Sequence, residues 1–213
     1  MNRANPVSGI RSSQIELLAS VLTRAFYDDP RVTYILPEEL TREGVLSWFF
    51  NAVAIRTSRL CGEIYTTANA EGVALWISPA VELTIAHAVR TEMSSLHFKL
   101  DRSSATRWIN LNRYLESVRR NVAGKPHWYL LALGTEPSIS ASEIRTKLIA
   151  PVLATADWEI RSCYVETFDE RDLPFYEQSG FRIAGAGQIP NGGPNFWTLI
   201  RPPSPTMLSC RNN

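Results

Sequence analysis

The stretch WYLLALGTEPSISASEIRTKLIAPVLATADW, residues 128–158, decides the fold because its hydrophobic pattern changes once, from that of a strand to that of a helix. Residues 128–133 are almost continuously apolar, which is typical of a strand buried on both faces of a sheet. Pro137 ends this strand, and a helix follows from about Ser142 to Trp158. A second apolar strand, CYVETF at residues 163–168, comes next. This order predicts a parallel pair of strands joined by a right-handed crossover.

The residues before this crossover predict helices and one hairpin. In the first helix, apolar residues recur at helical spacing, Ser12 or Ser13 serves as the cap, and Pro30 stops the helix. Two strand patterns then flank a turn and predict the hairpin. These elements cover about residues 12–29, 42–60, 63–67, 73–78 and 81–122, the last with a break near 101–104.

After the crossover the sequence predicts a short helix and two strands. DLPFYEQS forms the helix, which Gly180 closes, and FRIAGAGQI and NFWTLIR form the strands. No repeat, charged block or linker divides the chain. We therefore expect a single α/β domain over residues 1–213, with a mixed sheet covered by helices on both faces and loose tails at 1–12 and 202–213.

The composition argues against several classes of protein. Lys and Arg number 22 and Asp and Glu number 21, so the net charge of +1 offers no basic surface for nucleic acid or an anionic membrane. Three cysteines and three histidines are scattered, which indicates neither a disulfide framework nor a metal site. The N-terminus lacks a signal-peptide pattern, and no apolar run is long enough to cross a bilayer. We expect a cytoplasmic protein with a small-molecule substrate, and the sequence leaves the oligomeric state open.

Four segments carry a resemblance to a known superfamily. HWYLLALGTEP, LIAPVLATAD, CYVETFDERDLPFYEQSGFRI and GGPNFWTLIR resemble, in this order, the C-terminal half of GNAT-superfamily acyltransferases, especially small-molecule acetyltransferases. The most specific segment is LPFYEQSGFRI, where Tyr176, Gly180 and Phe181 match the family's final helix and the strand after it. LLASVLTRAFYDDP also looks like the usual first helix. The resemblance implies a single GNAT-like domain with a splayed pair of parallel strands.

The resemblance also implies where acetyl-CoA binds. The cofactor would lie between the strands at residues 128–133 and 163–167, and its pantetheine arm would pair with main-chain groups of Leu133, Gly134 and Thr135. The pyrophosphate would sit at the N-terminus of the following helix, where unpaired N–H groups and the helix dipole favour an anion. The residues that would hold it are Ser140, Ala141 and Arg145.

The phosphate turn departs from the family pattern, which is Gln/Arg-x-x-Gly-x-Gly/Ala. This chain has SASEIR at residues 140–145, so Glu143 and Arg145 stand where side chains are normally absent. A carboxylate near a pyrophosphate is repelled, by about 1 kcal/mol at ~4 Å in water. Arg145 could offset this by pairing with the phosphates, or it could pair with Glu143 and close the pocket. Both outcomes stay open, and with them the binding of acetyl-CoA.

Tyr176 matches the family tyrosine that protonates the thiolate of CoA as it leaves. A phenol with a pKa of about 10 can supply that proton in a dry cleft. The alternative is a buried structural tyrosine. In the same comparison, the backbone N–H near Leu133 would hold the oxyanion of the tetrahedral intermediate.

Glu166 is the candidate general base, because it lies in a strand whose neighbours indicate burial. A buried carboxylate is costly unless it is paired or functional, and burial raises its pKa toward the range useful for a base. The alternative is an ion pair with Arg161 or Arg171. Asp169 stands where the family often has an asparagine that touches the pantetheine arm.

For the other candidate residues, a structural role explains the sequence as well as a functional role does, or better. Asp28 and Asp29 lie near the family's acceptor site, but charged residues before a proline usually form a solvated turn. His127 opens a strand and is more simply structural. Five residues could line an aromatic acceptor pocket or pack in the core: Trp48, Phe49, Trp76, His87 and Trp108.

Three functions follow from the sequence. The first is an acyltransferase that moves an acetyl group from acetyl-CoA to an amine or hydroxyl of a small molecule, for example a secondary metabolite. The second is an enzyme on the same fold that has lost CoA and catalyses a cyclisation, isomerisation or decarboxylation of a hydrophobic biosynthetic intermediate. The third is a non-catalytic binding protein.

Overall fold

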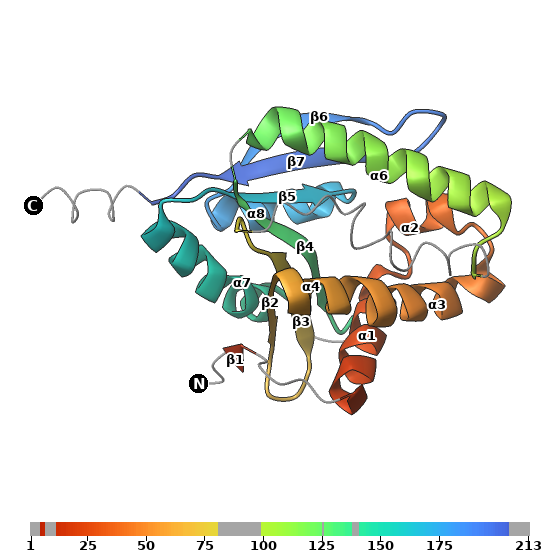
Figure 1. The fold of residues 1–213 in the computed structure, drawn as a ribbon, viewed down its shortest axis with the longest axis horizontal. Coiled ribbons are helices and arrows are strands. Elements are labelled where there is room, and N and C mark those ends of the chain that lie inside the picture. Colours follow the sequence, from red (N-terminus) through yellow and green to blue (C-terminus); the bar gives the residue numbers. More distant parts are fainter. Residues whose placement is uncertain (1–4, 7–11, 81–98, 125, 138–140, 205–213) are drawn as a thin grey trace, which may run out of the picture.

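A seven-stranded sheet organises the chain, with strand order β1-β2-β3-β4-β5-β7-β6 (Figure 1). The computed structural model describes residues 5–6, 12–80, 99–124, 126–137 and 141–204. All neighbouring strands are antiparallel except β4 and β5, so the sheet is mixed, as predicted. The strands are β1 Asn5–Pro6, β2 Gly62–Thr66, β3 Gly72–Ile77, β4 Trp128–Thr135, β5 Cys163–Thr167, β6 Arg182–Gln188 and β7 Asn195–Arg201.

The predicted hairpin and crossover are both present. β2 and β3 pair antiparallel from Gly62 opposite Ile77 to Thr66 opposite Val73. The crossover helix joins the parallel strands β4 and β5. The helices are α1 Ser12–Phe26, α2 Pro30–Ile35, α3 Glu39–Trp48, α4 Arg56–Cys61, α6 Arg102–Ala123, α7 Ala141–Glu159 and α8 Leu173–Gln178.

Pro30 does more than stop the first helix. α1 already ends at Phe26, and Pro30 begins α2, where a proline is tolerated because the first helical N–H needs no partner. Asp29 caps α2, since its Oδ1 accepts a hydrogen bond from the Arg31 N–H at 2.8 Å. The side chains of Ser12 and Ser13, the predicted caps of α1, lie outside the described part of the chain.

The single helix predicted over about residues 42–60 is three segments in the structure. A π-helix, η1 at Phe49–Ile55, lies between α3 and α4. Its apolar run buries Phe50 together with three consecutive residues, Val53, Ala54 and Ile55. The wider turn of a π-helix is rare and frequently found at functional sites. Here it places aromatic side chains along a cavity described below.

The helical segment predicted over residues 81–122 is described only from residue 99 onward, so His87 lies outside the described residues. α6 begins at Arg102, close to the break predicted near residues 101–104. Asp101 caps it, since Asp101 Oδ1 accepts hydrogen bonds from the N–H groups of Ser103 and Ser104 at 2.8 and 3.0 Å.

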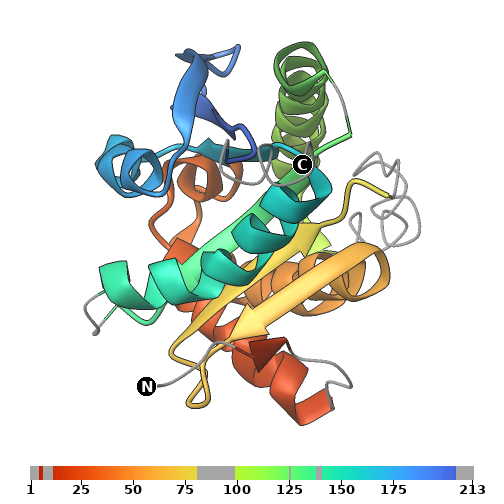
Figure 2. The same ribbon diagram turned by 90° about the vertical axis from the view of Figure 1, so that its left-hand side faces the viewer.

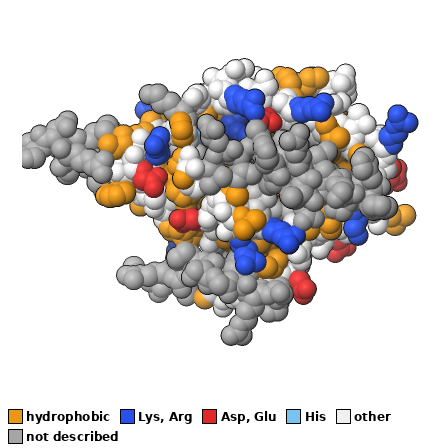
Figure 3. All heavy atoms as spheres, viewed as in Figure 1, with side chains coloured by type: hydrophobic (Ala, Val, Ile, Leu, Met, Phe, Trp, Pro, Cys, Tyr) orange, Lys and Arg blue, Asp and Glu red, His pale blue; other side chains and the backbone are white. Residues whose placement is uncertain are grey.

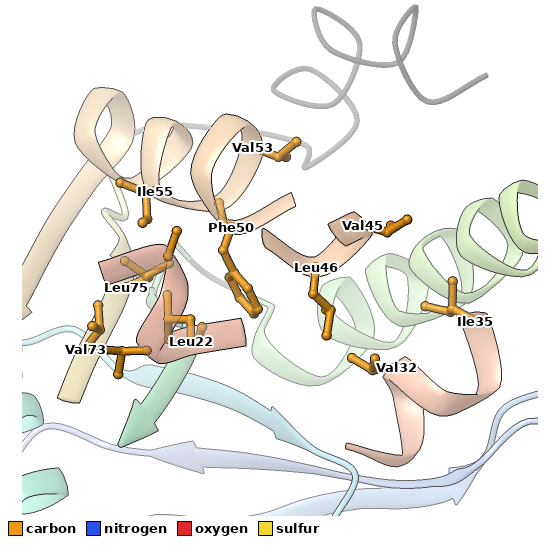
Figure 4. Close-up of a cluster of buried hydrophobic side chains, with 14 of the residues drawn as sticks. Leu22, Val32, Ile35, Val45, Leu46, Phe50, Val53, Ile55, Val73 and Leu75 are labelled. Carbon is orange, nitrogen blue, oxygen red and sulfur yellow. The ribbon is translucent and has the colours of Figure 1, made fainter. Parts of the chain in front are cut away.

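Helices cover both faces of the sheet, as Figure 2 shows with α7 crossing in front of the strands. α7 and α8 pack on one face, in a core that includes Leu148 and Phe181. α1, α2, α3, η1 and α6 contribute to a second core on the other face. In Figure 4, Leu46 and Phe50 of this second core point from α3 and η1 toward α1 and α2.

Gly134 lets α1 approach the end of β4. A Cβ atom at this position would lie 2.8 Å from the Cβ of Ala25 and 3.0 Å from Cδ2 of Leu22. We expect Gly134→Ala to lower the free energy of unfolding by about 1–3 kcal/mol, because the two elements must separate. The matched control is Gly44→Ala in α3, where a Cβ meets no atom within 4 Å. It should raise the free energy of unfolding by about 0.5–1 kcal/mol.

Urea denaturation of Gly134→Ala and Gly44→Ala measures the two predicted changes in the free energy of unfolding. Equal effects in the two variants, or a more stable Gly134→Ala protein, would contradict the close packing of α1 on β4.

Candidate active site

β4 and β5 separate part way along their length. They pair from Trp128 opposite Cys163 to Leu130 opposite Val165, and their register ends there. β4 continues to Thr135 alongside β3, whereas β5 continues to Thr167 alongside β7. Within the described residues, the β5-facing edge of β4 beyond Leu130 therefore has no strand partner. Free main-chain groups at such an edge can pair with an extended ligand.

A bulge in β4 marks the point of separation. Leu75 of β3 is opposite Ala132, but the next residue, Trp76, is opposite Leu130, so Leu131 is an extra residue in β4. An extra residue interrupts the alternation of side chains and bends the strand. Leu131 and Ala132 consequently both line the same cavity.

This cavity has a volume of about 80 Å³ and lies on the α6 side of the sheet. A cavity needs only about 10–15 Å³ to hold one water molecule, so there is room for a group of several heavy atoms. Its walls are mainly apolar and come from α2, α3, η1, α6 and β4. The apolar side chains include Val32, Ile35, Leu46, Phe49, Phe50, Val53, Trp108, Leu111 and Leu115.

Two of the five residues considered for an aromatic pocket line this cavity. Phe49 and Trp108 are in edge contact, with ring centroids 4.8 Å apart. Trp76 is fully buried in the core on the α7 side, and Trp48 packs against the core on the cavity side. His87 lies outside the described residues.

Glu166 lies in the cavity wall, at the point where β5 leaves β4. Two tyrosines donate hydrogen bonds to its carboxylate, Tyr164 to Oε1 at 2.9 Å and Tyr129 to Oε2 at 3.1 Å. Burial raises the pKa of Glu166, while the Arg119 charge and the tyrosine hydroxyls partly oppose the rise. Such an environment makes the carboxylate a stronger base than an exposed glutamate, which suits it to take up a proton.

The predicted ion pair of Glu166 with Arg161 or Arg171 is wrong. Arg171 pairs with Asp169 instead, with its Nη2 2.7 Å from Asp169 Oδ2. Asp169 also caps the 3₁₀-helix η2 at Glu170–Asp172, and the arginine holds the pKa of its carboxyl below the ordinary value. The side chains of Arg161 and Glu166 form no salt bridge in the described structure.

Two arginines that sequence reasoning missed flank Glu166. Arg119 of α6 lines the cavity with its Cζ 4.6 Å from the centroid of the Tyr129 ring. Arg31 of α2 lines it as well, with its Cζ 5.0 Å from the Phe168 ring and its Nε 3.8 Å from Asp29 Oδ1. The signal for Arg119 was present, because it follows Leu111 and Leu115 at helical spacing on the buried face of α6.

Tyr176 is buried on the opposite side of the sheet, in the core that α7 and α8 form. Burial raises its pKa to about 12, although the nearby Arg145 opposes the rise. The Arg145 guanidinium lies 4.0 Å from the centroid of the Phe175 ring and 5.6 Å from that of Tyr176. A phenol with such a pKa keeps its proton at neutral pH, as a general acid must.

Arg145 does not pair with Glu143, contrary to one of the two predicted outcomes. Its Nη1 donates to Asp172 Oδ1 at 2.9 Å, and Asp172 Oδ2 accepts a hydrogen bond from Thr167 at 3.1 Å. Glu143 is 78% exposed and pairs with Lys147 one turn along α7, at 2.6 Å. The Glu143 carboxylate therefore points to solvent, and Arg145 connects α7 to α8 beside Tyr176.

The remaining predicted cofactor residues lie at the end of β4 and the start of α7. Leu133, Gly134 and Thr135 pair with β3 on one side and border the opening toward β5 on the other. Ala141 begins α7, and its side chain is not among those described. Ser140 lies outside the described residues, so the structure does not test its role.

Asp28, Asp29 and His127 have structural surroundings. Asp28 is exposed, whereas Asp29 caps α2 and has its pKa raised, chiefly by burial. The His127 ring lies 5.5 Å from that of Tyr164. Asp29 thus belongs to a partly buried turn and not to the solvated turn that the sequence favours.

Other kinds of site find no support in the described residues. No group of three or more His, Cys, Asp or Glu side chains in this part of the chain is placed to hold a metal ion. None of the described helices has the length and apolar character needed to span a membrane. On the face shown in Figure 3, basic and acidic side chains are interspersed.

Comparisons with known proteins identify the fold. No family model matches the sequence. A Corynebacterium glutamicum structure described as histone acetyltransferase HPA2 and related acetyltransferase is 21% identical, with a TM-score of 0.67, over 95% of this chain and 97% of that one. Arylalkylamine N-acetyltransferase 2 of Aedes aegypti is 12% identical, with a TM-score of 0.57, over 95% and 99%. The C-terminal condensation domain of Ebony, in complex with beta-alanyl-dopamine, is 11% identical, with a TM-score of 0.58, over 95% and 99%.

At these identities the likeness establishes the fold alone. The chain has the fold of GNAT-superfamily acetyltransferases, which confirms the fold class expected from LPFYEQSGFRI and the three other segments.

Proposed function

We propose that this protein transfers an acetyl group from acetyl-CoA to an amine or hydroxyl of a small molecule. The observation that carries the proposal is the placement of two groups on opposite sides of the sheet near the β4–β5 pair. Glu166 lies in the cavity on one side of the sheet, and Tyr176 is buried on the other. The charge of the Arg31 guanidinium lowers the pKa of both groups, although burial raises each pKa by more.

The described residues fit a CoA thioester at the opening between β4 and β5. The free edge of β4 offers main-chain groups to an extended chain such as the pantetheine arm. The Glu143 carboxylate, which would repel a pyrophosphate, points to solvent and is neutralised by Lys147. The Arg145 side chain is 15% exposed, and its buried Nε–H has no partner in the described structure. Arg145 and the N-terminal turn of α7 would face the phosphates.

The chain's own groups then have separate tasks. Bound acetyl-CoA supplies a thioester-activated acetyl group. The Glu166 carboxylate takes a proton from the attacking amine or hydroxyl, and the two tyrosine hydroxyls that bond it hold it in place. The Tyr176 hydroxyl holds a proton for the leaving sulfur, and the Arg145 charge beside it favours the phenolate left behind.

The acceptor has an apolar part, because the cavity that contains Glu166 is lined mainly by aliphatic and aromatic side chains. Proteins of the same fold include an arylalkylamine and an agmatine N-acetyltransferase. These names support a small amine as the first class of acceptor to assay.

A thiol-release assay tests the proposed function. Purified protein is mixed with acetyl-CoA and a panel of arylalkyl amines, alcohols, and hydrophobic amino and hydroxy acids, and free CoA is measured. Acceptor-dependent release of CoA supports acetyl transfer. Product formed from a hydrophobic substrate without any CoA ester would contradict it and favour the CoA-independent alternative.

Arg145 and Glu143 should differ in their effect on the cofactor. We expect Arg145→Met to raise the KM for acetyl-CoA by about 10- to 100-fold, because a charge-assisted contact to phosphate is worth roughly 1.5–3 kcal/mol. Glu143→Gln should leave that KM within about twofold, because a surface ion pair contributes at most about 1 kcal/mol. Initial rates at varied acetyl-CoA check both. A large effect of Glu143→Gln with none from Arg145→Met would contradict the placement of these side chains.

A further inference from the structure

Arg119 is a buried cation without a hydrogen-bonding partner in the described structure. Only 8% of its surface is exposed, yet its guanidinium makes no hydrogen bond or ion pair there. Its charge is stabilised by the face of the Tyr129 ring and by attraction to Glu166. A guanidinium carries five N–H donors, and those of Arg119 are unpaired in the described structure although its nitrogens, unlike the buried Nε of Arg145, retain accessible surface.

Three other shielded arginines among the described residues are paired. Arg42 is 5% exposed and donates to the carbonyl oxygens of Leu36 and Pro37, at 2.9 and 3.0 Å. Arg201 makes two hydrogen bonds to Asp157, at 2.7 and 2.8 Å. Arg145, as described above, donates to Asp172. Arg119 therefore differs from the arginines that hold the fold together.

None of the described charged groups near Arg119 accepts a hydrogen bond from its guanidinium. Glu116 also lines the cavity but pairs with Arg120 on the outer side of α6. Glu166 accepts hydrogen bonds from two tyrosines. Arg31, the other cation of the cavity, has Asp29 beside it. The unused donors of Arg119 are left facing a mainly apolar cavity.

We infer that Arg119 binds a carboxylate of the acceptor, whose apolar part occupies the cavity and whose amine or hydroxyl lies next to Glu166. A guanidinium can bind a carboxylate with two parallel hydrogen bonds, which gives both affinity and orientation. The substrate class is then an amino acid or hydroxy acid with a hydrophobic side chain, and not a simple arylalkylamine.

Tyr129 sets the spacing between the two polar groups of this acceptor. Its hydroxyl donates a hydrogen bond to Glu166, and the Arg119 guanidinium lies over its ring, so Tyr129 contacts both the proton acceptor and the cation. The nucleophilic group and the carboxylate of the ligand must therefore be only a few bonds apart. Naming the ligand as acceptor rests on the proposed function, whereas the carboxylate subsite itself does not.

Calorimetry without acetyl-CoA tests the subsite apart from any reaction. The probes are 3-phenylpropionate, its uncharged amide 3-phenylpropanamide, and the cation 3-phenylpropylamine. We expect wild-type protein to bind the carboxylate at least about tenfold more tightly than the amide, since charge-assisted bonds are roughly twice as strong as neutral ones. Arg119→Met should abolish this preference, and Arg119→Lys should keep part of it. Arg113→Met, an exposed change on α6, should keep all of it.

Equal binding of acid and amide by the wild type, preference for the amine, or a preference that survives Arg119→Met would each overturn the inference. The wild-type comparison holds even if Arg119→Met fails to fold. Preference for the carboxylate together with no acetyl transfer to any hydrophobic amino or hydroxy acid would mean that the proposed function is wrong and the subsite real. Acetyl transfer to amines without any preference for the carboxylate would mean that the proposed function is right and the carboxylate subsite is wrong.

Discussion

Glu166→Gln lowers kcat for acetyl transfer by about 10²–10⁴-fold, the range that a positioned general base contributes. The amide keeps the shape of the side chain; its oxygen can accept a hydrogen bond from one of the two tyrosines and its NH2 can donate to the hydroxyl oxygen of the other, but it cannot take up a proton. The fold should therefore survive while the reaction slows. Steady-state kinetics with saturating acetyl-CoA measure the loss, and circular dichroism checks the fold.

The pH profile separates this role from a structural one. Burial raises the pKa of Glu166 above the ordinary glutamate value of about 4.3, so kcat/KM falls on the acid side as the pH drops through that raised pKa. Glu166→Gln should lose this acid limb. The matched control is Glu177→Gln, an exposed change on α8, which should keep both the rate and the limb. An unchanged kcat in Glu166→Gln would remove Glu166 as the base.

Tyr176→Phe lowers kcat by about 10²-fold or more with little change in the KM for acetyl-CoA, because the lost proton is needed by the leaving group and not for binding. The phenyl ring fills the same buried site beside Phe175 and Phe181, so stability should change little. Comparing kcat and KM for both substrates tests this split.

The control for Tyr176 is Tyr65→Phe. Tyr65 is also buried in the α7-side core, and its hydroxyl bonds Glu63 away from the opening. Removing that hydroxyl should leave kcat within about twofold, because Tyr65 lies on β2, away from the opening between β4 and β5. If both variants lose activity equally, the effect on Tyr176 is structural and the assigned acid is wrong.

The sequence predicts the parts of the fold that depend on periodicity. The continuous apolar run of β4 and the helical spacing of α7 specify the crossover, and DLPFYEQS with Gly180 specifies α8. The π-helix could not be predicted, because one wider turn inside a helical run of apolar residues hardly changes its period. The bulge at Leu131 could not be predicted for a similar reason: in a strand that is apolar on both faces, apolar and polar residues do not alternate, so an extra residue leaves no mark in the sequence.

The candidate site is predicted only where a residue's own surroundings in the sequence reveal its environment. Glu166 stands among strand residues, so its burial can be anticipated, but its tyrosine partner on β4 is 37 residues away. Arg145 pairs with Asp172 across 27 residues, a contact that depends on how α7 and α8 pack. Arg119 was missed because a charged residue near the end of a polar helix reads as solvated.

Titration of the protein with acetyl-CoA in a calorimeter is the decisive measurement, because the phosphate turn lacks the family's glycines and the β5-facing edge of β4 beyond Leu130 nevertheless has no strand partner among the described residues. We expect saturable binding at micromolar to millimolar acetyl-CoA, weakened in Arg145→Met and unchanged in Glu143→Gln. No heat of binding at millimolar acetyl-CoA, in protein shown to be folded, would contradict it.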